Sequence, residues 1–271
     1  MGRVVGKFVS GVVGPVIFKK VGNKQVVVAK SKKPQIAMTE ATYRASYIFG
    51  RASTLGAYIR SGTHNILRFY DSGMISRLTG ECNQILQKTT PIEGDELTLD
   101  HDYFSRLNGF EFNTASPVKR YLFTQPQATL SEESVVVNFP EMIIPRDLAF
   151  APHATYCTIA LRVLLLDLKS NQYLNQEIQA FDVELNTANP RFPAQQLTFK
   201  GAPGALCIVF LSLMYAEKTF AGKAVLNSKE ISPAAVLRAE FCPGESISRE
   251  RWSKMVFKDK KKRKSLKKKK D

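Results

Sequence analysis

The chain has 271 residues, of which 44% are apolar and 23% are charged. These proportions are typical of a globular protein, and they exclude a wholly disordered, collagen-like or coiled-coil chain. No apolar run reaches the 18 residues of a membrane-spanning helix, and the first residues lack the continuous apolar segment of a signal peptide. We therefore expect a cytoplasmic protein.

The net charge of +15 is concentrated at the two ends of the chain. Residues 1–36 contain eight Lys or Arg and no acidic residue, and residues 254–271 contain eleven Lys or Arg and two Asp. The residues between them, 37–253, carry a net charge of −2. We therefore expect the basic surface to lie on two terminal segments and the body of the protein to be nearly neutral.

Residues 1–36 are predicted to form a basic β-hairpin arm. Two runs rich in β-branched residues flank Gly22 and Asn23, which are typical of a hairpin turn, and Pro34 ends the second run. A two-stranded hairpin is marginally stable alone in water, so we expect this arm to pack on something else. We detect no internal repeat at a fixed period.

Residues 37–104 are predicted to form a helical segment followed by an acidic connector. One helix is expected from an N-cap at Thr39 to Arg60, and a second from Asp71 to Lys88. Their expected apolar faces are Ile48, Ala52, Leu55 and Ile59 in the first helix and Met74, Ile75, Leu78, Cys82 and Ile85 in the second. The carboxylates of residues 89–103 suit Ca²⁺, but they lack EF-hand spacing and favour a solvated loop, which could face the basic arm.

Residues 105–250 are predicted to form an antiparallel β-sandwich of about seven strands, because their β-rich runs are joined by turn signals. The expected strands are 134–139, 154–169, 173–185, 196–199, 205–217 and 234–241, with 196–199 and 205–217 paired. Residues 251–271 are expected to be a disordered Lys-rich tail. The predicted fold class is therefore mainly β with a helical segment, that is, α+β.

Several segments resemble an uncharacterised protein family that is abundant in Bacteroidota. They are Ser10–Val16, Lys33–Arg44, Leu107–Asn113, Ala151–Thr155 and Ile231–Val236. The resemblance implies a bacterial, intracellular origin, a Gly-rich N-terminal hairpin and a β-rich C-terminal domain. It implies no site residue, metal or cofactor, because that family has no established activity.

Motifs of common enzyme classes are missing from the sequence, which has no phosphate-binding glycine loop, His-Glu-x-x-His or Gly-x-Ser-x-Gly. The best candidate for catalysis is Asp182-Val-Glu184, whose carboxylates would share one face of a strand and could hold a divalent cation. The Lys that metal-dependent nucleases carry two residues later is Asn186 here, so an exposed polar sheet face is the favoured interpretation. Phe110 and Phe112 could form a platform for bases, although core packing is the favoured interpretation.

The cysteines and histidines give no metal or catalytic pattern. Cys82, Cys157, Cys207 and Cys242 lie apart among apolar neighbours and are expected to be buried free thiols. His64, His101 and His153 are far apart in the sequence. We predict no enzyme activity, no cofactor and no small-molecule substrate.

The leading hypothesis is binding of a polyanion, nucleic acid in preference to an anionic membrane, without sequence specificity. The alternative is a structural or assembly subunit that forms a homo-oligomer through the N-terminal hairpin and the sandwich. The predicted polyanion-binding residues are Lys19, Lys20, Lys24, Lys30, Lys32, Lys33, Lys258, Lys260, Lys261, Lys262, Arg263, Lys264, Lys267, Lys268, Lys269 and Lys270.

Overall fold

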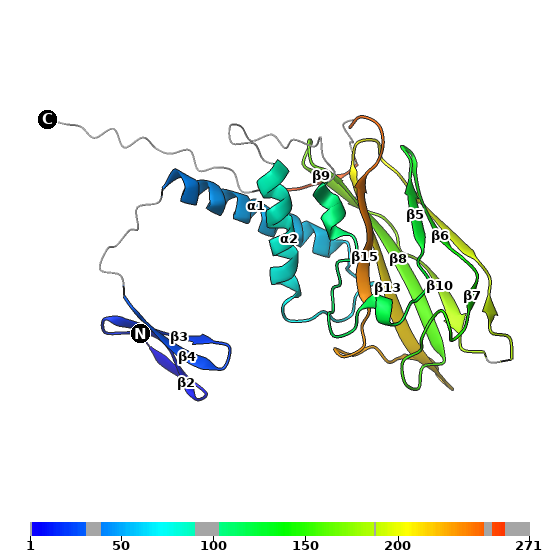
Figure 1. Ribbon diagram of the computed structural model, residues 1–271, viewed down its shortest axis with the longest axis horizontal. Coiled ribbons are helices and arrows are strands. Elements are labelled where there is room, and N and C mark those ends of the chain that lie inside the picture. The colour runs from blue at the N-terminus through cyan, green and yellow to red at the C-terminus, as the bar shows by residue number, and fades with distance from the viewer. Residues whose placement is uncertain (1, 31–38, 90–102, 187, 247–250, 258–271) are drawn as a thin grey trace. The chain divides into compact units, whose positions relative to one another are not determined.

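The structure is a computed structural model, and it describes residues 2–30, 39–89, 103–186, 188–246 and 251–257. The chain folds into two compact units, residues 1–44 and residues 45–271 (Figure 1). Strands outnumber helices in the described residues and all of their pairings are antiparallel, which confirms the predicted α+β class.

The N-terminal unit contains a four-stranded antiparallel sheet rather than an isolated hairpin. Its strands follow one another in the order β1 (Arg3–Val5), β2 (Phe8–Val13), β3 (Val16–Val21) and β4 (Lys24–Ala29). The predicted hairpin around Gly22 and Asn23 is β3 and β4, so that part is confirmed. The prediction of a two-stranded arm is wrong, because the strands β1 and β2 precede this hairpin.

A glycine begins each of the three turns in this sheet, and the glycines are eight residues apart. Gly6, Gly14 and Gly22 have φ angles of 60°, 56° and 59°. Only glycine adopts this left-handed region without a steric cost, so each glycine allows the chain to reverse at a fixed interval. This eight-residue period is a short repeat that our sequence analysis missed.

The two helices are α1 (Glu40–Ser61) and α2 (Met74–Thr89). The hydroxyl oxygen of Thr39 accepts a hydrogen bond of 3.2 Å from the backbone N–H of Thr42, which confirms the predicted N-cap. The predicted apolar face of α1 is buried. The second helix begins later than predicted, because the Asp71 carboxylate binds the N–H of Gly73 ahead of the first turn. Ile75 is 43% exposed, so its placement on the apolar face was wrong.

The second unit also contains two short 3₁₀ helices and twelve strands within the described residues. The short helices are η1 (Tyr103–Leu107) and η2 (Val118–Arg120). The strands are β5 (Gln127–Leu130), β6 (Ser134–Phe139), β7 (Met142–Ile143), β8 (Tyr156–Asp167), β9 (Gln172–Asn175), β10 (Gln179–Glu184), β11 (Arg191–Phe192), β12 (Gln195–Lys200), β13 (Leu206–Thr219), β14 (Gly222–Val225), β15 (Ala234–Phe241) and β16 (Ser253–Lys254).

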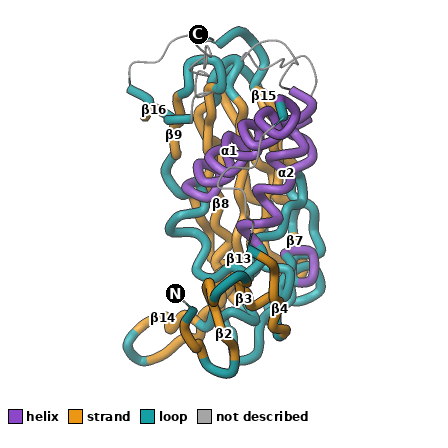
Figure 2. Tube along the Cα trace, turned by 90° about the vertical axis from the view of Figure 1, so that its left-hand side faces the viewer, coloured by secondary structure: helices purple, strands orange, loops and turns teal. Residues whose placement is uncertain are grey.

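These strands form a large sheet, a smaller sheet and a short ladder. The large sheet has the order β14-β13-β8-β9-β16, with β10 also paired to β8 and β15 to β13. The smaller sheet has the order β12-β6-β5, and β11 pairs with β7. One hydrophobic cluster lies between the two sheets, and a second lies between the large sheet and the helices. Figure 2 shows α1 and α2 together on one face of the large sheet.

The two central strands of the large sheet, β8 and β13, are buried on both faces. In β8, Ile159 belongs to the cluster between the sheets, whereas Ala160 belongs to the cluster under the helices. Strand β13 divides its side chains in the same way. Helix α2, and α1 from Ala45 onward, therefore belong to the same compact unit as the sandwich.

Two of the expected strand relationships differ from the structure. The predicted strand 173–185 is split into β9 and β10, which both pair with β8. The predicted pairing of 196–199 with 205–217 is wrong, because β12 pairs with β6. Gly201 donates its N–H to the carbonyl oxygen of Glu133 at 2.7 Å and leaves no room for a Cβ atom. This close approach ties the end of β12 to the smaller sheet.

The segment 251–257 is ordered, which corrects the predicted disordered tail at its beginning. Strand β16 pairs with β9, and Met255 is only 5% exposed within the cluster under the helices. The sequence signal was weak because the apolar run of residues 255–257 is only three residues long and is flanked by Lys254 and Lys258. The rest of the predicted tail, residues 258–271, lies outside the described residues.

Candidate polyanion-binding surface

The N-terminal sheet has no buried residue among residues 2–30. Its valines are exposed on several strands, and Val4 and Val21 have exposed fractions of 75% and 61%. A folded sheet of this size ordinarily buries one face against another element. The described residues 2–30 carry exposed apolar groups and exposed charged groups together.

Six cationic side chains of the N-terminal sheet are exposed, and no carboxylate lies within residues 1–36 to neutralise them. They are Arg3, Lys7, Lys19, Lys20, Lys24 and Lys30. Unpaired cations on one small element produce a positive potential that attracts polyanions.

Four of the predicted binding residues are described here, and the structure divides them between the two ends of the β3–β4 hairpin. Lys19, Lys20 and Lys24 lie near the turn at Gly22. Lys30 lies at the other end, where its backbone N–H donates a 2.7 Å hydrogen bond to the carbonyl oxygen of Pro15. The remaining predicted residues lie outside the described residues: Lys32, Lys33, Lys258, Lys260, Lys261, Lys262, Arg263, Lys264, Lys267, Lys268, Lys269 and Lys270.

The N-terminal sheet contains an aromatic ring next to two of its cations. The ammonium group of Lys20 is 4.8 Å from the centroid of the Phe8 ring, and that of Lys7 is 5.7 Å away. Both distances are within the range of a cation–π interaction. Our sequence analysis missed Phe8 as a candidate binding residue because Lys20 is distant from it along the chain. The adjacent Lys7 was a signal that could have identified Phe8.

The predicted aromatic platform at Phe110 and Phe112 is not available. Phe112 is fully buried and Phe110 is 9% exposed, and the two rings contact each other edge to face at 5.3 Å. Both belong to the cluster under the helices, so the favoured interpretation of core packing is confirmed.

Asp182 and Glu184 share the exposed face of β10, as their spacing predicted, but each carboxylate has a protein partner. Asp182 forms an ion pair of 2.5 Å with Lys223 and accepts a 2.5 Å hydrogen bond from Thr158. Glu184 accepts a hydrogen bond of 2.9 Å from the Tyr156 hydroxyl group. The bonds from Lys223 and then Thr158 hold the pKa of Asp182 below its usual value.

All four cysteines are buried free thiols, as predicted. Burial raises the pKa of the Cys82 thiol to about 12. The histidines do not gather in the described residues: His64 lines a small pocket of about 250 Å³ with Arg60 and Tyr70, and His153 occupies a left-handed turn. His101 and residues 90–102 of the acidic connector, including the proposed Ca²⁺ ligands, lie outside the described residues.

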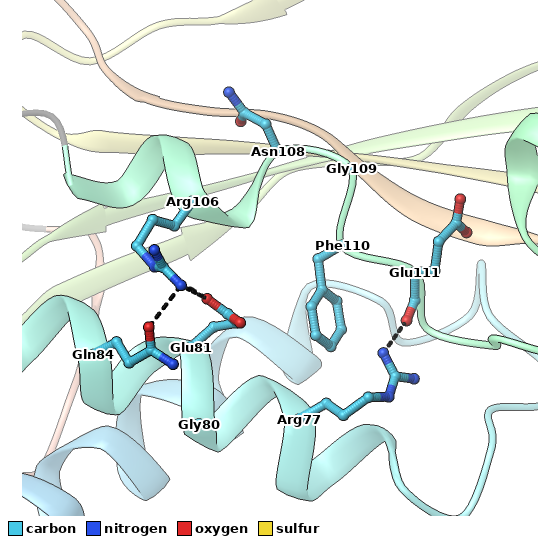
Figure 3. Close-up of a pocket in the computed structure, with 9 residues that line it drawn as sticks. All are labelled: Arg77, Gly80, Glu81, Gln84, Arg106, Asn108, Gly109, Phe110 and Glu111. Carbon is cyan, nitrogen blue, oxygen red and sulfur yellow. Dashed lines mark hydrogen bonds and ion pairs between the residues drawn. The ribbon is translucent and has the colours of Figure 1, made fainter.

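An open groove of about 550 Å³ runs between α2 and the segment after η1. Figure 3 shows that its two guanidinium groups point toward partners that already bind them. Arg106 binds the carboxylate of Glu81 at 2.9 Å and the side-chain oxygen of Gln84 at 2.7 Å. Arg77 binds the Glu111 carbonyl oxygen at 2.9 Å and also the Asp71 carboxylate.

The remaining carboxylate of this groove is also used by the fold. Glu111 accepts hydrogen bonds from the backbone N–H of Val118 at 3.0 and 3.1 Å, while burial raises its pKa above the usual value. The polar groups of the groove therefore join α2 to the sheet and to the chain before η2, and they leave no unmatched charge for a ligand.

The described part of the chain has neither a cluster of metal-ligating side chains nor a helix that could span a membrane. No group of three or more His, Cys, Asp or Glu side chains there could hold a metal ion. No helix there is long and apolar enough to span a membrane.

Comparison with known proteins gives no match. No family model, curated protein or solved structure is significantly similar to this chain.

Proposed function

We propose that this chain is a non-enzymatic protein that binds a polyanion, in the first place nucleic acid, through its basic termini. The observation that carries this proposal is the set of six exposed cations of residues 2–30, in a sheet whose own segment contains no carboxylate. The Lys-rich residues 258–271 add ten basic side chains in the sequence. Lysine ammonium groups contact phosphates without reading bases, so the binding is indifferent to sequence.

The test is fluorescence anisotropy of the full chain with two labelled duplexes of unrelated sequence over a series of salt concentrations. We expect equal affinities for the two duplexes and a linear fall of log K with log salt, because binding releases counterions. A variant in which Lys19, Lys20 and Lys24 are replaced by Glu should bind more weakly at every salt concentration. Binding that prefers one duplex, or that is insensitive to salt, contradicts the proposal.

A second function, assembly, is favoured by one observation. The outer strand β4 has no partner on its free edge among the described residues, and all six of its residues are exposed. An unpaired, valine-rich edge is a template for a strand of a second copy. Light scattering of the full chain and of a variant lacking residues 1–38 separates the two functions. Assembly predicts that the deletion converts an oligomer to a monomer, whereas polyanion binding alone predicts the same oligomeric state for both.

A further inference from the structure

We propose that the N-terminal sheet binds single-stranded nucleic acid in preference to a duplex, with one base stacked on Phe8 and adjacent phosphates bound by Lys7 and Lys20. This inference rests on the proposed polyanion binding and narrows its ligand. Four features carry it: the change of partner of β2 at Gly11, a side chain that fixes the first half of β2, the Phe8 ring with two ammonium groups over it, and the charge around the ring.

Strand β2 changes its partner at Gly11. The residues from Phe8 to Ser10 pair with β1, whereas those from Gly11 to Val13 pair with β3. Gly11 has a φ of 111°, which side chains disfavour. The first half of β2 can therefore turn away from the plane of the β3–β4 hairpin.

The side chain of Gln25 fixes the first half of β2. Its amide oxygen accepts a 2.8 Å hydrogen bond from the backbone N–H of Val9, and its amide nitrogen donates to the Val9 carbonyl oxygen at 3.0 Å. The same nitrogen donates to the carbonyl oxygen of Lys19 at 3.0 Å. Gln25 is the cross-strand partner of Lys20, so these bonds hold Phe8, the neighbour of Val9, beside Lys20.

The resulting arrangement contains the groups that a single-stranded nucleotide needs. The Phe8 ring is partly exposed, and the ammonium groups of Lys20 and Lys7 lie 4.8 and 5.7 Å from its centroid. Because these ammonium groups lie over the ring, a stacked base takes the place of an ammonium group, which then turns to the adjacent phosphate. Such stacking tolerates any base. In a duplex the faces of the bases are already stacked on one another, so Phe8 adds nothing to the affinity for a duplex.

The charge of the sheet selects an anionic ligand, because residues 2–30 carry six cations and no acid. Heparin and anionic lipid headgroups match this charge, but they have no aromatic face for Phe8. The ring beside the cations is therefore the feature that favours single-stranded nucleic acid over the other polyanions.

The experiment compares the full chain with the variants Phe8→Ala, Phe8→Trp and Phe220→Ala. Phe220 is a fully exposed aromatic of the β13–β14 turn, so its variant controls for loss of an exposed ring elsewhere. The probes are a labelled 15-nucleotide oligothymidine, a duplex of equal length, heparin and vesicles containing phosphatidylserine. The removal of one base–aromatic stack should weaken oligothymidine binding by about 5- to 150-fold.

We expect Phe8→Ala to leave heparin affinity within about twofold and Phe220→Ala to leave every affinity unchanged. Phe8→Trp should retain oligothymidine affinity, and its added indole fluorescence should be quenched by oligothymidine but not by heparin. This variant keeps the test valid if Phe8→Ala disrupts the sheet. Equal weakening for heparin and oligothymidine without quenching in Phe8→Trp, or no weakening at all, overturns the inference.

The remaining outcomes separate this inference from the proposed function. Tighter binding to the vesicles than to oligothymidine overturns the inference in favour of a membrane surface. No binding to any probe overturns the proposed function itself. Binding to every polyanion that is unaffected by Phe8→Ala overturns only the inference about stacking.

Discussion

The backbone N–H of Val256 donates a hydrogen bond of 2.8 Å to the hydroxyl oxygen of Tyr58, which joins the C-terminal segment to α1 across 198 residues of sequence. The same segment covers α1 with the ring of Phe257, which lies 5.0 Å below the guanidinium group of Arg51. Residues 251–257 therefore belong to the folded unit, and the cationic residues that follow begin directly after this attachment.

Truncation after residue 250 should destabilise the protein, whereas truncation after residue 257 should not. The longer truncation removes the buried Met255 side chain and the hydrogen bond to Tyr58. Loss of one buried side chain of this size costs about 2 kcal/mol, which corresponds to a fall in Tm of about 4–8 °C for a unit of this length. Differential scanning calorimetry of both truncated proteins measures the difference, and equal Tm values would show that the segment does not stabilise the fold.

The four cysteines should be inert in the native protein. Each thiol is buried, and burial raises the pKa of the Cys82 thiol to about 12, so the reactive thiolate form is scarce near neutral pH. Titration with Ellman's reagent should detect no reactive thiol in the native chain and four after denaturation. Rapid reaction of a native thiol would contradict the burial of that residue.

The elements that follow a simple local pattern were predicted well from the sequence. Strands 134–139 and 234–241 have the predicted bounds, and α1 has the predicted cap at Thr39. In each case a regular alternation or a capping residue lies within a few neighbouring positions. Local physical chemistry is sufficient there because the partner element does not decide the outcome.

Relationships between distant residues could not be predicted in the same way. The pairing of β12 with β6 depends on the close approach of Gly201 to Ser134, and the aromatic site depends on Gln25 reaching Val9. Neither contact leaves a periodic signal in the sequence. The first half of the N-terminal sheet was missed for another reason: its glycine turns recur every eight residues, but Gly6 and Gly14 were not recognised as turns of a meander.

Substitution of the buried Asp167 by Asn should destabilise the fold at neutral pH. Burial alone would raise the pKa of Asp167, but its hydrogen bonds from the Ser246 hydroxyl at 2.6 Å and the Ser170 N–H at 3.1 Å hold the pKa below its usual value. The lost charge-assisted bonds should cost about 1–3 kcal/mol. Urea unfolding of the variant at pH 7 measures this loss, with Asp182→Asn as an exposed control.

The stabilisation of the fold by Asp167 should depend on pH in acid. Because its folded pKa is lower than its unfolded value near 3.8, Asp167 stabilises the fold above that value and loses this contribution as the pH falls through the folded pKa. The difference in unfolding free energy between wild type and Asp167→Asn should therefore be constant from pH 7 to about pH 5 and should shrink below about pH 4. A difference that grows in acid would contradict this assignment.

The pair Asp182 and Glu184 should have no catalytic role. The double variant Asp182→Ala, Glu184→Ala removes one exposed ion pair to Lys223 and the exposed hydrogen bonds from Thr158 and Tyr156, so the change in unfolding free energy should be small, about 1 kcal/mol. Its polyanion affinity should equal that of the wild type. Cleavage of DNA or RNA by the wild type in the presence of Mg²⁺ or Mn²⁺, abolished in the double variant, would establish the enzyme activity that we predict to be missing.

The two basic termini should contribute separately to the salt dependence of duplex binding. Residues 258–271 contain ten basic and two acidic residues, and the N-terminal sheet presents six cations. If the tail neutralises about five phosphates, it contributes about −4.5 to the slope of log K against log salt. Truncation after residue 257 should flatten the slope by that amount and lower the affinity at least tenfold at about 0.15 M salt. Replacement of Lys19, Lys20 and Lys24 by Glu should flatten the slope further, because these cations belong to the other end of the chain. The amount should be smaller, because only three cations are lost there. A slope that is unchanged by truncation would place duplex binding on the N-terminal sheet alone, and a slope that the truncation abolishes would leave that sheet without a part in duplex binding.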